Sequence, residues 1–338
     1  MTIKRPKKFF RNTLENIEMI KNHEGKVLVL GGAGFIGSHI STRFVDAGYQ
    51  VTVIDGLLSK TGGHKKNLCE IIKKIEFVPK RIEQVRELDK YIRNSTLIVD
   101  CMGWTPHLLA LENPIYDLQL NCLSHLYLIN ALKKCPQKNV IYLGSKGQYG
   151  KSLEKRVDER TWSQPSDIQG IHKLAAESYF RIFSEPLNLS VVSLRLGNCF
   201  GPRQKTKSKD IGLVGYFIAA SLKGENIILY GKTRKKALIY VQDVAETVFQ
   251  LAQKMTPGFN VFNYSGTEIF ITDLVKKIIN LTDSGKIKIE SMPERIKTVD
   301  MGNTQVNEHK LKTKLGHIPT ANLDTALEAT INYFKENI

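Results

Sequence analysis

Paired cysteines are the first feature that the sequence lacks. Its five cysteines are scattered, and no two of them have the Cys-x-x-Cys spacing of zinc and redox sites. Their odd number and apolar neighbours argue against a disulfide framework. We therefore expect reduced, mostly structural thiols, no metal site and a cytoplasmic location.

Long apolar runs are also missing. No stretch approaches the length of about 20 residues that spans a bilayer, and the first residues lack the apolar core of a signal peptide. Residues 1–24 instead form a basic extension. It could contact an anionic membrane or a partner subunit through residues 1–20. A short helix packed on the outer face of the domain is the simpler interpretation.

Acidic residues are scarce relative to basic ones, and the formal net charge is +16. Such a balance raises the question of an acidic partner, which could be nucleic acid, an anionic membrane or a phosphorylated substrate. Lysines are spread along the whole chain, however, and no recognition helix or RNA-binding aromatic motif accompanies them. We therefore assign most of the charge to the solvated surface and expect no nucleic-acid partner.

What the sequence does contain is a glycine cluster between an apolar run and an amphipathic segment. Residues 26–37 read KVLVLGGAGFIG, which predicts a buried strand, a tight turn and the start of a helix. Gly31 suits the turn, Gly34 permits close approach of a pyrophosphate, and Gly37 lets the helix pack on the strand. A dinucleotide phosphate is expected at the N-terminus of that helix.

A second predicted strand, QVTVID, ends in a carboxylate at Asp55. It lies about twenty residues after the glycines, where an acid accepts hydrogen bonds from the adenosine ribose. A carboxylate at that point repels a 2′-phosphate, so the predicted cofactor is NAD rather than NADP. A plain strand-end acid is the alternative, which the spacing disfavours.

Strands and helices are predicted to alternate from residue 26 to residue 196. The expected strands are 26–31, 50–55, 75–78, 96–102, 138–144 and 189–196, and the expected helices include 64–74, 82–93, 115–134 and 171–185. Such alternation predicts an α/β fold with a doubly wound parallel sheet, which binds ligands at the carboxyl ends of its strands. After Gly201 the pattern loosens: we expect a helix at 211–223, a short strand at 226–230, and a strand and helix over 238–252. A smaller, interleaved C-terminal lobe is therefore predicted as the place for a substrate pocket.

Several stretches together resemble the extended short-chain dehydrogenase/reductase family, the NAD-dependent nucleotide-sugar epimerases and dehydratases. They are GGAGFIG (31–37), VTVID ending at residue 55, NVIYLGSKGQYG (139–150), QGIHKLAAE (169–177), LRLGNCFGPRQ (194–204), LIYVQDVAE (238–246) and LKTKLGHIPT (311–320). They occur in the family's order and cover about residues 25–335. Co-occurring motifs are far more specific than any one of them.

The resemblance implies an NAD-binding Rossmann domain over residues 25–198 plus about 238–265. The nucleotide-sugar-binding lobe would comprise about 199–237 plus 266–338. Cofactor contacts are implied at Gly31, Gly34, Phe35, Ile36, Gly37, Asp55 and Lys173. The dimer that the family favours would form through the helices at 115–134 and 171–185.

One position departs from the family at the active site. Relatives carry Tyr-x-x-x-Lys, in which the tyrosine exchanges a proton with the sugar and the lysine holds the cofactor ribose. Here the lysine is Lys173 and the assisting hydroxyl is Ser145, but the tyrosine position is Gln169. An amide has no proton to exchange at neutral pH, so Gln169 can orient a substrate but cannot act as the base.

Three explanations for this departure stay open. In the first, another side chain is the base, and the candidates are Tyr149, His172, Lys146 and Lys173 itself. In the second, the enzyme deprotonates a keto sugar beside its carbonyl group. In the third, the protein binds NAD and a nucleotide sugar without turning them over.

Basic and polar residues in the later part of the chain are expected to bind the substrate diphosphate. The resemblance implies Asn198 and Lys236, with Lys236 standing where relatives have an arginine. Arg203, Arg234 and Arg295 are further candidates for phosphate contacts, and the segment 212–217 is expected to open the pocket.

The favoured function is an NAD-dependent nucleotide-sugar epimerase or oxidoreductase of polysaccharide or glycoconjugate precursors, acting by 4-epimerase-like hydride transfer. A nucleotide-sugar dehydratase is the alternative. Dehydrating relatives carry Asp-Glu directly after the Ser or Thr, and this chain has Lys146 and Gly147 there.

Overall fold

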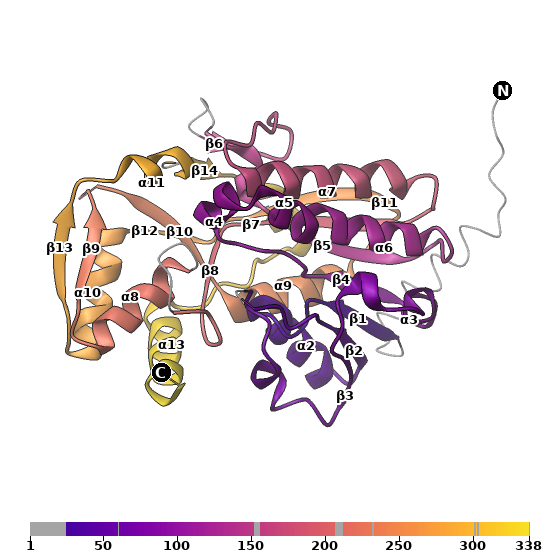
Figure 1. The fold of residues 1–338 in the computed structure, drawn as a ribbon, viewed down its shortest axis with the longest axis horizontal. Coiled ribbons are helices and arrows are strands. Elements are labelled where there is room, and N and C mark those ends of the chain that lie inside the picture. Colours follow the sequence, from indigo (N-terminus) through magenta and orange to yellow (C-terminus); the bar gives the residue numbers. More distant parts are fainter. Residues whose placement is uncertain are drawn as a thin grey trace.

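The computed structural model describes residues 25–337, except 60, 152–155, 207–211, 232, 301 and 303 (Figure 1). The predicted basic extension, residues 1–24, lies outside the described residues. Within the described part, no helix has both the length and the apolar character needed to cross a membrane.

A parallel sheet of seven strands forms the centre of the larger lobe. Its order is β11 (Gly258–Tyr264), β7 (Ser190–Leu196), β5 (Asn139–Ser145), β4 (Leu97–Asp100), β1 (Lys26–Leu30), β2 (Gln50–Ile54) and β3 (Ile75–Val78). The apolar runs of the central strands β4, β5 and β7 are almost entirely buried because helices cover both faces, whereas β3 at the edge is partly exposed. The predicted doubly wound sheet is confirmed. Strand β11 was not among the predicted strands.

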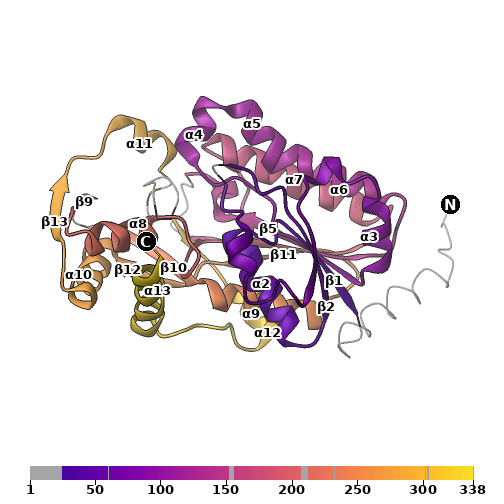
Figure 2. The ribbon, with the colours of Figure 1, turned by 60° about the horizontal axis from the view of Figure 1, so that its bottom comes forward.

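Helices cover the two faces of this sheet (Figure 2). One face carries α2 (Phe35–Asp46), α9 (Val241–Gln253) and α12 (His309–Leu315). The other face carries α3 (Leu88–Asn94), α6 (Ser124–Leu132) and α7 (Ile168–Ser184). Between each helical layer and the sheet lies a cluster of buried aliphatic and aromatic side chains. This close packing fixes the positions of the strands and of their carboxyl ends.

Three predicted helices differ from the structure. Residues 64–74 form only a 3₁₀ turn, Lys65–Leu68, followed by further turns, because the backbone of His64 and the side chain of Asn67 are tied to the Ala33 carbonyl at 3.0 and 2.9 Å. Residues 82–93 divide into a 3₁₀ turn and α3. The predicted 115–134 helix consists of α5 (Pro114–Leu118), a π-helical turn and α6.

The smaller lobe stands beside the carboxyl ends of the sheet strands (Figure 1). It contains the sheet β12 (Thr267–Phe270), β10 (Lys235–Tyr240) and β8 (Asn198–Phe200), and the pair β13 (Lys286–Glu290) and β9 (Asn226–Tyr230). Its helices are α8 (Leu213–Leu222), α10 (Ile271–Thr282), α11 (Glu294–Val299) and α13 (Leu323–Asn337). A separate apolar cluster holds these elements together. The predicted domain boundaries stay a prediction.

Two short elements complete the described chain. A two-stranded sheet pairs β6 (Arg156–Val157) with β14 (Gln305–Val306), which links the larger lobe to the later part of the chain. Helix α4 (His107–Glu112) follows the loop after β4 and packs against both α7 and α11. Because α11 belongs to the smaller lobe, α4 lies where the two lobes meet.

Candidate functional site

A cavity of about 570 Å³ lies at the carboxyl ends of the sheet strands and is walled on its far side by the smaller lobe. It is lined by the glycine loop and Asp55 at one end and by Asn198, Arg234 and Lys236 at the other. Ser145, Gln169 and Lys173 line it as well. Most of the predicted site residues thus share one cavity.

The glycine loop closes tightly on the start of α2. Gly31 has a φ of +71° and donates its N–H to the Ile54 carbonyl at 2.8 Å. A Cβ at Gly37 would stand 2.3 Å from the Gly31 carbonyl oxygen, so no larger residue fits there. Phe35 and Ile36 line the cavity beside these glycines. A phosphate-sized anion can therefore approach the helix N-terminus, as a dinucleotide requires.

Asp55 follows β2 and is only 8% exposed. Its two carboxylate oxygens accept hydrogen bonds from the backbone N–H groups of Ala33 and Leu57, at 2.9 and 2.8 Å. Burial raises the pKa of Asp55, and the two backbone hydrogen bonds oppose that rise. The carboxylate is thus fixed at the cofactor end of the cavity, where it suits ribose hydroxyls and disfavours a 2′-phosphate.

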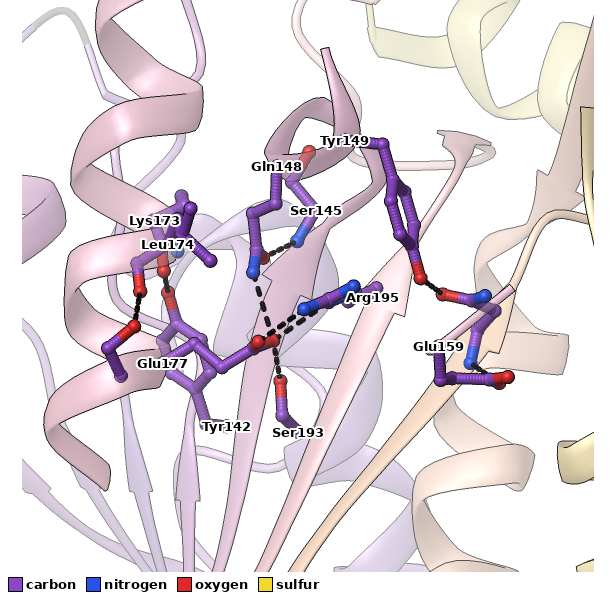
Figure 3. A network of polar contacts seen from close by, with 12 residues as sticks. Tyr142, Ser145, Gln148, Tyr149, Glu159, Lys173, Leu174, Glu177, Ser193 and Arg195 are labelled. Carbon is purple, nitrogen blue, oxygen red and sulfur yellow. Dashed lines mark hydrogen bonds and ion pairs between the residues drawn. The ribbon is translucent and has the colours of Figure 1, made fainter. Parts of the chain in front are cut away.

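The turn after β5 is held in place by a buried polar network (Figure 3). Ser145 Oγ accepts from the Gly147 N–H at 3.0 Å, and the Gln148 carboxamide oxygen accepts from the Ser145 N–H at 2.8 Å. Gln148 in turn donates to Glu177 at 2.9 Å. The turn that carries the Ser145 hydroxyl is therefore held in place by buried hydrogen bonds through Gln148 to Glu177.

Glu177 and Arg195 form the charged centre of that network. Arg195 donates to the two Glu177 oxygens at 2.5 and 3.0 Å, and Ser193 adds a bond at 2.6 Å. Burial opposes ionisation, but the hydrogen bonds and charge of Arg195 outweigh it and lower the pKa of Glu177. This ion pair was not found from the sequence, because its partners come from α7 and β7.

Lys173 and Gln169 both hold the loop that follows β4. Lys173 Nζ donates to the carbonyls of Met102 and Leu143 at 3.0 and 3.2 Å. Burial lowers the pKa of Lys173, while the carboxylates of Asp100 and Asp117 oppose the change. Gln169 Nε2 donates to the Trp104 carbonyl at 3.0 Å. The amide at the tyrosine position is thus engaged with the protein backbone.

The four candidate bases occupy different places. Tyr149 is 1% exposed, donates its hydroxyl to Asn263 at 2.8 Å and does not line the cavity; burial raises its pKa. His172 also lies off the cavity and pairs with Asp117 at 2.6 Å. Lys146 does line the cavity, as Lys173 does. Burial, reinforced by nearby Lys236, lowers the pKa of Lys146 to about 8.

The five predicted diphosphate residues divide in the same way. Arg234 and Lys236 line the cavity and share the Asp300 carboxylate, at 2.5 and 3.4 Å. Asn198 lines it too, and its amide donates to the Ala237 carbonyl at 3.0 Å. By contrast, neither Arg203 nor Arg295 lines it.

The two outlying arginines are engaged in ion pairs elsewhere. Arg203 pairs with Glu70 at 2.9 Å, and Arg295 pairs with Glu112 at the surface. Arg203 follows β8 by only a few residues, and its side chain turns toward the segment after β2. In this structure both arginine side chains are therefore engaged away from the cavity lining.

One pair at the cavity was missed by sequence reasoning. His107 lines the cavity, and its Nδ1 lies 2.7 Å from Asp167 Oδ2. The other oxygen of Asp167 accepts the Gly170 N–H at 2.7 Å and so caps α7. An acid before a helix is a readable capping signal. Its histidine partner is the first residue of α4, 60 positions away, and no local pattern indicates that pairing.

Comparison with known proteins relates this chain to nucleotide-sugar enzymes. A sequence model of the NAD dependent epimerase/dehydratase family matches residues 27–264. A putative UDP-glucose 4-epimerase of Methanocaldococcus jannaschii is 26% identical over 316 residues, which are 92% of this chain and 99% of that protein. These matches extend through both lobes.

Two solved structures share the fold at low identity. The UDP-N-acetylglucosamine 4-epimerase of Methanobrevibacter ruminantium, solved with UDP-N-acetylmuramic acid, is 25% identical with a TM-score of 0.84, covering 93% of this chain and 99% of its own. The UDP-glucose 4-epimerase of Thermus thermophilus, solved with NAD, is 25% identical with a TM-score of 0.81, covering 93% and 100%.

Proposed function

The chain belongs to the NAD dependent epimerase/dehydratase family, and from this premise we propose that it transfers hydride reversibly at a carbon of a nucleotide-diphosphate sugar. The observation that carries the proposal is the single cavity that joins the glycine loop and Asp55 to the cations Arg234 and Lys236. The residues expected to bind the dinucleotide and those expected to bind the diphosphate thus line the same cavity. Ser145 and Lys173 line the same cavity.

The residues at the cofactor end fit NAD. The helix N-terminus beyond Gly34 suits the pyrophosphate, Asp55 suits the adenosine ribose, and Lys173 suits the second ribose. When bound, NAD supplies a reversible hydride acceptor. The ammonium of Lys173 donates two hydrogen bonds to carbonyls at the ends of β4 and β5. Because it has three N–H groups, it can donate a further hydrogen bond to a ribose hydroxyl.

The substrate end fits a diphosphate. Arg234, Lys236 and Lys146 line the cavity around the Asp300 carboxylate, and three cations there favour an anionic ligand. Asn198 adds an amide on the same wall. A sugar placed between this cluster and the cofactor would have one of its oxygens within reach of the Ser145 hydroxyl, which can donate a hydrogen bond to it.

Hydride transfer is favoured over dehydration by the residues after Ser145. Eliminating water needs an acid and a base beside the sugar, and the turn provides Lys146 and Gly147 instead of carboxylates. A deprotonation-type epimerase acting on a keto sugar is the second candidate, because the pKa of Lys146 is lowered to about 8. The third is a protein that binds both ligands without turnover.

The test is proton NMR of the protein with NAD and a panel of UDP-, GDP-, CDP- and dTDP-sugars in D₂O, beside a Lys173→Met control. Epimer formation without deuterium uptake supports hydride transfer and return. Deuterium uptake beside a keto group supports the deprotonation mechanism instead. No change of any sugar while NAD is bound overturns the proposed turnover.

A homodimer is part of the proposal. Apolar side chains that are exposed in the single chain gather on α5 to α6 and on α7: Ile115, Leu118, Leu123, Tyr127, Ile171 and Ile182. Helices α5 and α7 pack against each other, so these residues belong to one helical layer. An Ile115→Asp variant should shift the protein toward monomer in sedimentation velocity, and an unchanged mass would contradict this interface.

A further inference from the structure

The cavity lacks the proton-exchanging tyrosine of the relatives, so another side chain must take the proton if the sugar is oxidised. Gln169 cannot do so, and its amide is bonded to the Trp104 carbonyl. Lys173 donates to two carbonyls and Tyr149 is buried away from the cavity. The role is therefore open among the groups that do line the cavity.

His107 is the one histidine that lines this cavity in the described part of the chain. Its side chain is about one third exposed, whereas that of Asp167 is 2% exposed. A carboxylate can only accept, so its bond places an N–H on His107 Nδ1, and Nε2 is the ring nitrogen that points away from Asp167. Because Asp167 also caps α7 through Gly170, the carboxylate cannot easily turn away.

The pair is also well placed relative to Gln169. Asp167 precedes Gln169 by two residues at the start of α7, and His107, the first residue of α4, follows Trp104 by three residues. Gln169 bonds the Trp104 carbonyl, and Asn121 bonds both polar groups of the Trp104 backbone at 2.9 and 2.8 Å. The backbone just before α4 is therefore held against the start of α7, the helix that carries the tyrosine in relatives.

We propose that His107, oriented by Asp167, exchanges the proton with the sugar hydroxyl in place of the missing tyrosine. This inference rests on the proposed hydride-transfer function. The O–H bond of the sugar breaks and its proton passes to Nε2, while the electron pair of the adjacent C–H bond leaves as the hydride that NAD accepts. When the hydride and the proton return, the carbonyl so formed is reduced to a hydroxyl again.

Other groups in the cavity suit this role less well. Histidine is the side chain that most often serves as a general acid or base in enzymes. Burial raises the pKa of the Cys101 thiol well above its usual value. Lys146 lies among the cations around Asp300, where a charged ammonium serves the diphosphate. Asp55 is engaged at the cofactor end by two backbone N–H groups.

A second histidine–carboxylate pair provides a matched control. His172, on α7, has its Nδ1 2.6 Å from Oδ1 of Asp117, which lies on α5. His172 does not line the cavity. His107→Gln and His172→Gln therefore remove the same chemistry from two places. Asp167→Asn adds a third variant: it keeps an oxygen for the helix cap, while its amide N–H presented to Nδ1 would place the proton on Nε2.

The first measurement is the kinetics of the full chain with NAD and the nucleotide sugar that reacts fastest in the panel. We expect His107→Gln to lower kcat about 100-fold or more with little change in KM. Asp167→Asn should lower kcat similarly, and His172→Gln should stay within about threefold of the wild type. Added imidazole should restore part of the activity of a His107→Gly variant. Near-wild-type kcat in His107→Gln, or an equal loss in His172→Gln, overturns the assignment.

A second measurement does not depend on turnover. With NAD present, the His107 ring proton resonances, assigned by their loss in His107→Gln, are followed by NMR as UDP or UDP-glucose is added. We expect UDP-glucose to shift them and to change their titration midpoint, UDP to do so much less, and His172 to respond to neither. If no sugar in the panel reacts, the proposed function fails. If the His107 resonances also stay unchanged when UDP-glucose is added, this inference is overturned as well.

Discussion

The two ends of the cavity are built in different ways. The cofactor end consists of glycines, backbone N–H groups and one carboxylate, which come from residues 31–37 and 55. The proposed reaction centre consists of side chains from β5, α7 and the start of α4. The proposed cofactor contacts thus come mostly from one short stretch of chain, whereas the proposed reaction centre combines segments that are distant in the sequence.

The two ends also differ in how much room they leave for substitution. The glycine loop has little freedom to vary, because a Cβ at Gly37 would meet backbone at 2.3 Å. The tyrosine position can hold Gln169, because the amide finds the Trp104 carbonyl as a partner. The comparison predicts that variants at the two ends separate cofactor binding from catalysis.

The largest effect is expected at the glycine loop. Gly37→Val would force the start of α2 away from the Gly31 carbonyl, since the clash is with backbone and not with a flexible side chain. We expect NAD binding to become undetectable by calorimetry and the free energy of unfolding to fall by about 1–3 kcal/mol. Gly48→Ala is the control, because a Cβ there meets nothing within 4 Å, although its φ of +87° adds some strain. Unaltered NAD affinity in Gly37→Val would refute the cofactor site.

The next largest effect is expected beneath the reaction centre. Glu177→Gln leaves Arg195 buried without its counter-ion and should lower the free energy of unfolding by about 3–5 kcal/mol, measured in urea. The lowered pKa of Glu177 means that its contribution is present above its unfolded pKa and is lost as the pH falls through the folded one. The acid-side loss of stability should therefore be weaker in the variant. Equal stability of both proteins across this pH range would contradict the role of the pair.

Cofactor choice should change at Asp55 without loss of the fold. Asp55→Asn removes the charge that repels a 2′-phosphate, so we expect NAD to bind about tenfold more weakly and NADP relatively better. Fluorescence titration with both dinucleotides measures the ratio. A preference for NAD that survives the substitution would show that Asp55 is not the discriminating group.

The smallest effect is expected at Lys146. Its pKa is lowered to about 8, so the ammonium loses its proton as the pH rises through that value and its attraction for a diphosphate is lost. We expect UDP to bind about fivefold more weakly at pH 9 than at pH 7, which corresponds to about 1 kcal/mol. Lys146→Met should remove most of this dependence. A wild-type affinity that is flat from pH 7 to 9 would contradict the assignment of Lys146 to the substrate end.

Local patterns were enough to predict the sheet and the cofactor end. In residues 26–55, an apolar run followed by glycines and, at a fixed spacing, by an acid predicts a strand, a turn and a ribose contact. The helix at 64–74 was wrong because contacts to Ala33 from a distant part of the chain decide the conformation there. Periodicity cannot report such contacts.

The reaction centre could be predicted only in part. Ser145, Gln169 and Lys173 were located by resemblance, and the structure brings them into one cavity. His107 and Asp167 lie 60 positions apart in the sequence, and the carboxylate pairs of Arg203 and Arg295 lie 133 and 183 positions away. Such pairings depend on how loops cross at the strand ends, so composition and spacing do not contain them.

The fate of the hydrogen on the reacting carbon tests the central claim most directly. UDP-glucose and the other sugars of the panel, each deuterated at C4, would be incubated with the protein and NAD in ordinary water and followed by NMR and mass spectrometry. Hydride transfer and return at the same carbon predicts a 4-epimer that retains its deuterium at C4. Replacement of that deuterium by solvent hydrogen, or no epimer from any sugar while NAD is bound, would contradict the account.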